Sequence, residues 1–167
     1  MPTDQTPLAR AQAVVLRQLA SRARTEAQLR ARLAREDLSE VADQVMAWLR
    51  RLGYLDDAAY ARARARALVA PGRLGPRAAE RKLVAEGIGA AAARAAVQAA
   101  LAGEDGQGGG RQEEALCRAL AERRARGTPL SALDARGRAR LGRFLAGRGF
   151  SGSIIARVLG IFEDGEA

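Results

Sequence analysis

The chain has 167 residues, which suits one domain or a short array of small units, and it carries 28 basic against 19 acidic residues. With no histidine and one cysteine, Cys117, the sequence excludes Ser-His-Asp and Cys-His catalysis, histidine-bearing metal sites and an internal disulfide. The net charge of +9 favours an anionic partner, which could be a nucleic acid, a membrane surface or an acidic protein.

Alanine dominates the apolar composition, with 39 residues, whereas only six residues are aromatic. Because alanine is the strongest helix former and β-branched residues are scarce, the composition predicts an all-α protein. Bulky apolar side chains are too few for one thick core, so we expect an elongated body. Cys117 lies in an Ala-Leu-Cys-Arg-Ala-Leu context that predicts a small core residue rather than a reactive thiol.

Six helices are predicted before residue 103, and capping and turn residues mark their ends. Thr25 and Gln28 have the spacing of a capping box, and Gly53 is placed as the left-handed residue that ends a helix. The predicted helices are residues 7–21, a segment that begins at Thr25, a segment from the N-cap Ser39 to Gly53, a segment capped by Asp56 that carries Tyr60, residues 75–87 and residues 90–102.

The second half of the chain begins with the sequence GEDGQGGG, residues 103–110, which predicts a flexible linker. Helices are predicted at 111–126 and at 131–146, and a last helix is predicted to be capped by Ser151. The chain therefore contains about nine predicted helices and no convincing strand.

A repeated step organises these helices: a leucine precedes a bulky apolar residue by five positions, and a cap-capable residue follows at once. The copies are offset by 50 and 62 residues, and they predict three three-helix repeats that stack in tandem. The longer second junction makes the third repeat the one expected to move relative to the others. The pairs are Leu33 and Leu38, Leu83 and Ile88, and Leu145 and Phe150; the predicted units are 8–55, 56–102, the linker 103–110, and 111–163.

Catalytic groups are sparse. Asp56 and Asp57 are adjacent carboxylates, but a helix cap and a first-turn acid account for both, so no metal site is predicted. The Gly-rich segment lacks the Gly-Lys-Ser/Thr ending of a phosphate-binding loop. The sequence therefore predicts no cofactor and no enzyme.

Arginine is more informative, because groups of Arg recur on the middle helices of the three predicted repeats. For any single Arg, a solvated helix face remains the simpler interpretation. Together, the groups predict a basic track along an elongated body that would bind phosphates without reading bases. Because no aromatic residues interleave with the Arg residues, stacking on single-stranded bases is not predicted.

Several blocks of the sequence resemble the RecX regulatory proteins. The resemblance runs in order from about Ala11 to Leu159. Its blocks are RARTEAQL (residues 22–29) with Leu33, LGYLDD (52–57) followed by Tyr60 and Ala61, Gly75 with Leu83, Gly87 and Ile88, and RGFS (148–151) with Ile155 and Leu159.

The resemblance implies a curved, elongated monomer of tandem three-helix repeats. It also implies binding in the groove of the RecA filament on single-stranded DNA. There the protein would inhibit ATP hydrolysis, strand exchange and the co-protease activity that drives the SOS response. Binding to DNA itself is a further property of the family.

We therefore predict a negative regulator of RecA. Its expected location is the bacterial cytoplasm, because the sequence has no secretory signal pattern and no apolar run long enough to span a membrane. The expected partners are the RecA filament and single- or double-stranded DNA, without sequence preference. A basic helical DNA-binding or architectural protein is the alternative, and the lack of aromatic anchors argues against a membrane-surface binder. The residues predicted to contact phosphates or acidic surfaces are Arg24, Arg32, Arg35, Arg62, Arg66, Arg77, Arg81 and Arg148.

Overall fold

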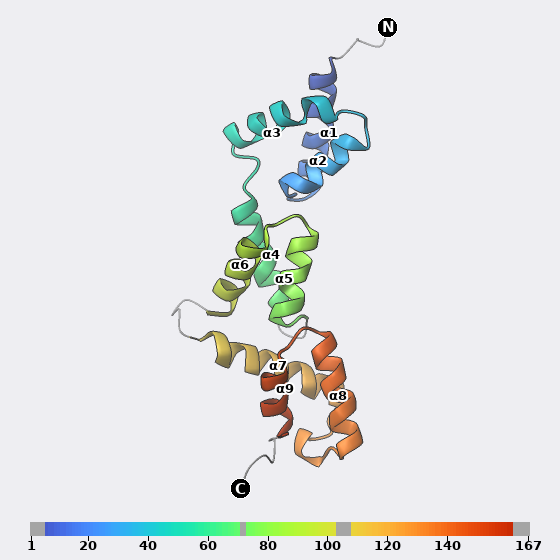
Figure 1. Cartoon of the computed structure of the whole chain (residues 1–167), viewed down its shortest axis with the longest axis vertical. Coiled ribbons are helices and arrows are strands. Elements are labelled where there is room, and N and C mark those ends of the chain that lie inside the picture. The colour runs from blue at the N-terminus through green and yellow to red at the C-terminus, as the bar shows by residue number, and fades with distance from the viewer. Residues whose placement is uncertain (1–5, 71–72, 103–107, 162–167) are drawn as a thin grey trace.

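The computed structural model describes residues 6–70, 73–102 and 108–161, which form nine α-helices and two short 3₁₀ helices without a strand. The helices follow one another along an elongated body in three consecutive trios (Figure 1). The first trio is α1 (Pro7–Ser21), α2 (Glu26–Ala34) and α3 (Ala42–Arg51); the second is α4 (Asp57–Val69), α5 (Pro76–Ala85) and α6 (Ala90–Ala102); the third is α7 (Gly109–Ala125), α8 (Ala135–Gly147) and α9 (Gly152–Leu159).

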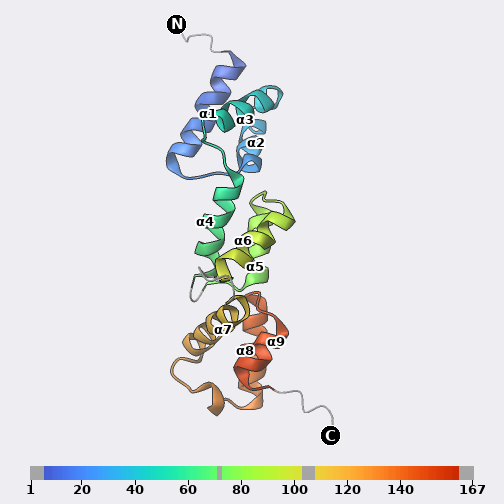
Figure 2. The same ribbon diagram turned by 90° about the vertical axis from the view of Figure 1, so that its left-hand side faces the viewer.

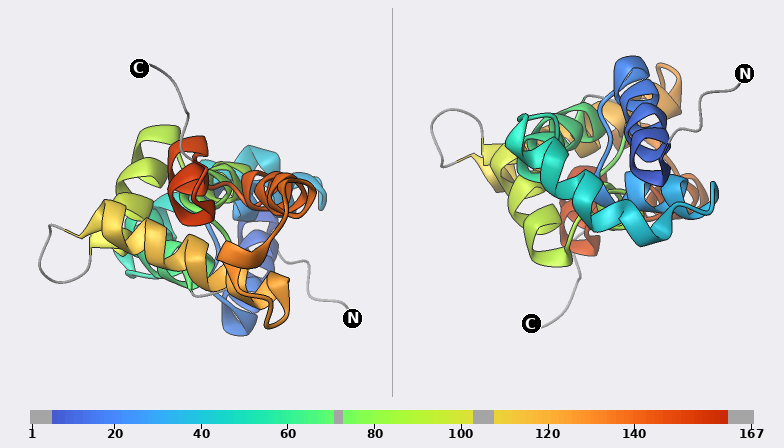
Figure 3. Two further views of the ribbon diagram at one scale, coloured as in Figure 1. Left: turned by 90° about the horizontal axis from the view of Figure 1, so that it is seen from below. Right: turned by 90° about the horizontal axis from the view of Figure 1, so that it is seen from above.

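The three trios succeed one another along the long axis, and a view turned by 90° keeps the same order (Figure 2). Seen along that axis from below, α7, α8 and α9 lie nearest the viewer (Figure 3). The predicted all-α, elongated array of three-helix repeats is therefore confirmed.

Three predicted helix caps are present. The Thr25 hydroxyl accepts a hydrogen bond from the Gln28 amide at 3.2 Å, and the Gln28 side chain accepts one from the Thr25 amide at 3.4 Å. Asp56 accepts from the Ala59 amide at 2.8 Å, and Ser151 caps α9. These side chains satisfy amides that have no partner within the helix, which is why the helices begin where they do.

Two predicted helix starts are wrong. Ser39 makes no capping bond: residues Ser39–Val41 form a 3₁₀ turn and α3 begins at Ala42. The helix predicted from residue 131 begins instead at Ala135, because Asp134 caps it by accepting from the Gly137 amide at 2.7 Å. Leu133 packs on the core in an extended conformation, so a helix cannot run through it.

The linker prediction is partly wrong. Residues 103–107 lie outside the described residues, but α7 begins at Gly109, two residues before the predicted start of the helix. The helical backbone of Gly109 and Gly110 therefore belongs to the third trio.

The buried apolar side chains of the described residues form two hydrophobic cores. The first trio packs around its own core, centred on Leu33, Val45 and Leu49. The second and third trios share one continuous core that runs from Ala61 on α4 to Leu159 on α9. Burial of apolar side chains thus joins the third trio to the second, and the expectation that the third repeat moves relative to the others stays a prediction.

The two junctions between trios use the same construction. The turn after α5 places Gly87 against Ala27 near the start of α2, and the turn after α8 places Gly149 against Ala78 near the start of α5. At the first junction the Thr25 hydroxyl donates to the Glu86 carbonyl at 2.6 Å. At the second junction the Gly75 amide donates to the Arg148 carbonyl at 2.8 Å. The turn after α5 therefore packs on the start of α2, and the turn after α8 packs on the start of α5.

Candidate anion-binding surface

Part of the Arg complement serves to hold the fold together. Seven ion pairs occur among the described residues, and six Arg residues make them. Arg64 is the best integrated: its guanidinium donates to both carboxylate oxygens of Glu86, which also accepts from the Tyr60 hydroxyl at 2.9 Å. The paired Arg residues are Arg30, Arg32, Arg50, Arg64, Arg118 and Arg157.

The predicted contact residues of the first trio are largely engaged within it. Arg32 pairs with Glu36, and Arg24 donates to the Gln18 side chain at 2.8 Å. Arg35 is exposed, but its Nε donates to the Ala31 carbonyl at 3.2 Å. The Nε atoms of Arg24 and Arg32 are also buried. The first trio therefore presents less free positive charge than the sequence suggests.

The predicted contact residues of the second trio are free. Arg62 and Arg66 are exposed on α4, and Arg77 and Arg81 are exposed on α5. Within the described ranges, none of these four makes an ion pair. Each pair is one helical turn apart, so its members lie on a common face.

The structure brings two predicted residues to the same junction. The Arg77 amide donates to the Gly149 carbonyl at 3.2 Å, next to Arg148, so Arg77 and Arg148 meet where the second and third trios join. The guanidinium of Arg148 lies 5.1 Å from the centre of the Phe144 ring. Arg24, Arg32 and Arg35 belong to the first trio, which the second trio separates from the third (Figure 1).

The strongest concentration of free charge lies in the third trio. Between residues 123 and 148 the chain has eight Arg residues and one acidic residue, Asp134, whose carboxylate caps α8. In the part of the chain that the structure describes, none of the eight makes an ion pair. They are Arg123, Arg124, Arg126, Arg136, Arg138, Arg140, Arg143 and Arg148.

A cavity of about 410 Å³ opens at this surface between the end of α7 and α8. Arg124, Arg126 and Arg140 line it together with Phe144 and Leu133. The Arg124 guanidinium lies 5.2 Å from the centre of the Phe144 ring, so Arg124 and Arg148 both make cation–π contacts with one aromatic side chain. We call this cavity the α7–α8 pocket; its chemistry suits an anion.

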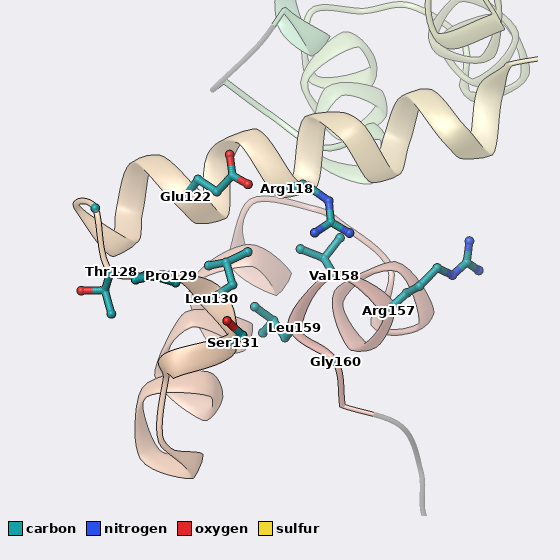
Figure 4. A pocket seen from close by; sticks show the side chains of 11 residues that line it. Arg118, Glu122, Thr128, Pro129, Leu130, Ser131, Arg157, Val158, Leu159 and Gly160 are labelled. Atoms are coloured by element: carbon teal, nitrogen blue, oxygen red, sulfur yellow. The ribbon is translucent and has the colours of Figure 1, made fainter.

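A larger cavity of about 600 Å³ lies between α7 and α9, and its charge is mixed (Figure 4). Arg118 and Glu122 project from α7, and Val158 and Leu159 come from α9 (Figure 4). The two Arg residues of this cavity, Arg118 and Arg157, both pair with Glu114. This neutralised cavity is a poorer anion site than the α7–α8 pocket.

Nucleophilic and metal chemistry find no support in the described residues. Cys117 is buried, as predicted, and burial raises the pKa of its thiol to about 11, so it carries no thiolate near neutral pH. No group of three or more carboxylate or cysteine side chains within the described ranges could hold a metal ion. Nor is any helix among them long and apolar enough to cross a membrane.

Sequence reasoning missed most of the α7–α8 pocket. None of the three Arg residues that line it, Arg124, Arg126 and Arg140, was predicted as a contact. Arg148 was predicted, but it contacts only the ring of Phe144 and does not line the pocket. A charge count in a sliding window would have found the basic segment 123–148. Phe144 and Arg148 are one helical turn apart at the end of α8, a spacing that is visible in the sequence. The contact of Arg124 with the same ring leaves no comparable signal, because it depends on how α7 meets α8.

Two family models match the chain. The model of the first three-helix domain of RecX matches residues 11–49, and the model of its third three-helix domain matches residues 112–159. Together they cover just over half of the chain. This chain belongs to the RecX family.

Solved RecX structures agree with this assignment. A crystal structure of regulatory protein RecX is 25% identical, with a TM-score of 0.74 over 91% of this chain and 72% of that one. The crystal structure of RecX from Lactobacillus salivarius is 20% identical, with a TM-score of 0.76 over 92% of this chain and 95% of that one, and it supports the fold alone. No curated protein sequence matches the chain.

The RecX-like sequence block at residues 52–57 is only partly structural. Gly53 ends α3 with a φ of 71°, Leu55 is buried and Asp56 caps α4. Leu52 and Tyr54, however, are 50% and 59% exposed. Packing of this chain alone does not explain these two side chains.

Proposed function

We propose that this RecX-family protein is a negative regulator of RecA in the bacterial cytoplasm. It binds as a monomer in the groove of the RecA filament on single-stranded DNA. From there it inhibits ATP hydrolysis, strand exchange and the co-protease activity. The protein acts by occupying a surface and not by catalysis.

One observation carries the proposal: the elongated body presents Arg residues on successive trios that have no carboxylate partner among the described residues. They include Arg62 and Arg66 on α4, Arg77 and Arg81 on α5, and the Arg group of residues 123–148. A filament groove offers both acidic protein surface and DNA phosphate, so a body of this shape and charge can bridge successive RecA subunits. Bridging would hinder their ATP-coupled movement or further growth.

A RecA ATPase assay tests the proposal. We expect the DNA-dependent ATPase of RecA to fall when this protein is added at well below one molecule per RecA subunit. Inhibition that begins only when the protein saturates the DNA would contradict the proposal and favour a DNA-binding protein without a recombinase partner. Electron microscopy of RecA filaments with and without the protein provides a second measurement, in which we expect density along the groove.

A charge reversal tests the contact surface. We expect Arg77→Glu combined with Arg81→Glu to weaken filament binding and leave the helical circular dichroism signal unchanged. The matched control is Arg10→Glu with Arg17→Glu on α1, which changes the net charge equally at exposed sites of the first trio. Equal filament affinity for the α5 variant and the wild type would exclude this Arg pair from the interface.

A further inference from the structure

We propose that the α7–α8 pocket binds phosphate groups of the nucleic-acid backbone directly. The third trio is then the part of the molecule that contacts DNA within the filament. The inference rests on the proposed function for its setting, but its chemistry can be measured without RecA.

Charge balance distinguishes this pocket from the cavities beside Arg118 and beside Arg77, and the number of Arg residues distinguishes it from the cavity beside Arg66, which has one. Three Arg residues line it and no carboxylate does. The cavity beside Arg77, by contrast, is also lined by Glu80 and Glu113. A phosphate entering the α7–α8 pocket therefore meets positive charge that no acidic side chain of the pocket offsets.

The guanidinium group of Arg124, which lines the pocket, and that of Arg148, which does not, are both oriented by an aromatic ring before any ligand binds. Arg124 and Arg148 both lie over the half-buried Phe144 ring. A guanidinium that rests on a ring through its face still has its N–H edge available, and that edge matches two phosphate oxygens. Because the ring limits the freedom of two long side chains, less conformational entropy is lost when a phosphate binds.

The surroundings of the pocket favour a polyanion over a single acidic side chain. Arg123, Arg136 and Arg143 do not line the pocket, but they are exposed on the two helices that form it and raise the positive charge of the third trio. A nucleic-acid backbone carries closely spaced charges along its whole length, so it can engage several of these cations and release counterions. An isolated carboxylate of a protein would satisfy only one or two of them.

The same geometry argues against base recognition. Phe144 is half-buried, and two guanidinium groups lie over its ring, so the ring is not an open platform for a base. Apart from the Arg residues, the Thr128 hydroxyl is the one polar side-chain group in the lining; the other side chains there are apolar, and they include Leu133 and Leu141. We therefore infer binding that depends on the backbone and is independent of the base sequence.

The test uses the full chain and a fluorescently labelled single-stranded oligonucleotide of mixed sequence, without RecA. Anisotropy titrations at several salt concentrations compare the wild type with Arg126→Glu plus Arg140→Glu. We expect the double variant to bind about tenfold or more weakly and to show a smaller dependence of affinity on salt. The Arg10→Glu plus Arg17→Glu variant provides the control for net charge, and we expect it to lose much less affinity.

A second variant, Phe144→Leu, tests the positioning of the guanidinium groups, since it keeps every charge and an apolar side chain of similar bulk. We expect several-fold weaker binding with a nearly unchanged salt dependence. Circular dichroism confirms that each variant is folded. Equal losses for the pocket and α1 variants, or unchanged DNA binding by the pocket variant, would overturn the inference.

RecA assays separate the two proposals. If the wild type inhibits RecA and the pocket variant binds DNA normally but fails to inhibit, the pocket contacts the recombinase protein and the DNA inference is overturned. If the pocket variant loses DNA binding and the wild type does not inhibit RecA, the pocket inference stands and the proposed function fails.

Discussion

Individual residues with left-handed backbone define the end of each middle helix. Asp37, Gly87 and Gly149 have φ values of 56°, 96° and 93°. In all three turns the next residue donates its amide to a leucine carbonyl five positions earlier: Leu38 to Leu33, Ile88 to Leu83 and Phe150 to Leu145. The five-residue step in the sequence is thus the signature of one repeated helix-ending turn.

Gly149 is constrained twice, by its φ and by its neighbour, because an added Cβ would overlap the backbone of Ala78. We expect Gly149→Ala to lower the free energy of unfolding by about 2 kcal/mol or more, since left-handed backbone alone costs an alanine about 1–2 kcal/mol. The matched control is Gly147→Ala, two residues earlier on α8, where an added Cβ meets nothing within 4 Å. We expect that change to stabilise by up to about 1 kcal/mol. Urea denaturation measures both, and equal effects would contradict the junction geometry.

Glu86 makes the stability of the folded protein depend on pH. Burial alone would raise the pKa of its carboxyl, but hydrogen bonds from Arg64 and Tyr60 outweigh burial and hold the pKa below its ordinary value. The charged Glu86 carboxylate therefore stabilises the folded state fully above the pKa of an unfolded glutamate, about 4.3. This contribution is lost as the pH falls through the lower pKa that Glu86 has in the folded state.

We expect Glu86→Gln to be less stable than the wild type at pH 7, with a difference that narrows as urea unfolding is repeated toward pH 3. Exposed Glu40→Gln on the first trio is the control, because Glu40 makes no ion pair among the described residues. A stability gap for Glu86→Gln that stays constant with pH would show that the charge of Glu86 is not responsible.

At the scale of elements, the first junction is held by side-chain hydrogen bonds, whereas backbone hydrogen bonds cross the second. Thr25 is fully buried, and its hydroxyl accepts from Gln28 within α2 and donates to the Glu86 carbonyl of the second trio. The Glu26 amide adds a bond of 3.0 Å to the Asp57 carboxylate at the start of α4. One side chain therefore both caps α2 and joins two trios.

We expect Thr25→Val to destabilise by about 1–3 kcal/mol, because it removes the helix cap and a buried hydrogen bond while keeping the side-chain volume. Thr25→Ser retains the hydroxyl and loses one methyl group, so its loss should stay at or below about 1 kcal/mol. Thermal denaturation followed by circular dichroism compares the two. A serine variant as unstable as the valine variant would assign the effect to packing.

At the scale of the whole molecule, the two separate cores predict two unfolding units. Trp48, the single tryptophan, packs on the core of the first trio, so its fluorescence reports that unit. Leu145 belongs to the shared core of the second and third trios and is fully buried.

We expect Leu145→Ala to cost about 2–5 kcal/mol, to move the main circular dichroism transition to lower urea, and to shift the Trp48 fluorescence transition much less. Leu33→Ala, in the first core, should do the reverse. Identical shifts of both signals in both variants would show that the molecule unfolds as one cooperative unit.

The junction geometry is not repeated at the outer faces of the first and third trios. Asp37 occupies the position of Gly87 and Gly149, so it has a side chain where those turns approach a preceding helix closely. At the other end, Gly137 is offset by 62 residues from the Gly75 docking site, but α8 starts before it and the Asp134 carboxylate covers it. We expect light scattering to give the mass of one chain, and a concentration-dependent dimer would contradict this.

The sequence by itself determined the helical class, most helix ends and the repeat. These features depend on local chemistry: alanine propensity, capping by Thr25, Asp56 and Ser151, and glycine at left-handed positions. Such interactions span only a few residues, so their spacing is visible in the chain.

Only the tertiary structure decided which trios share a core, which Arg residues are free, and where free charge surrounds a cavity. Arg64 is neutralised by Glu86, which lies 22 residues further along the chain at the end of α5. Arg124 and Arg148 are 24 residues apart, yet both meet on Phe144. These outcomes depend on the distances between helices, and the periodicity within one helix carries no information about them.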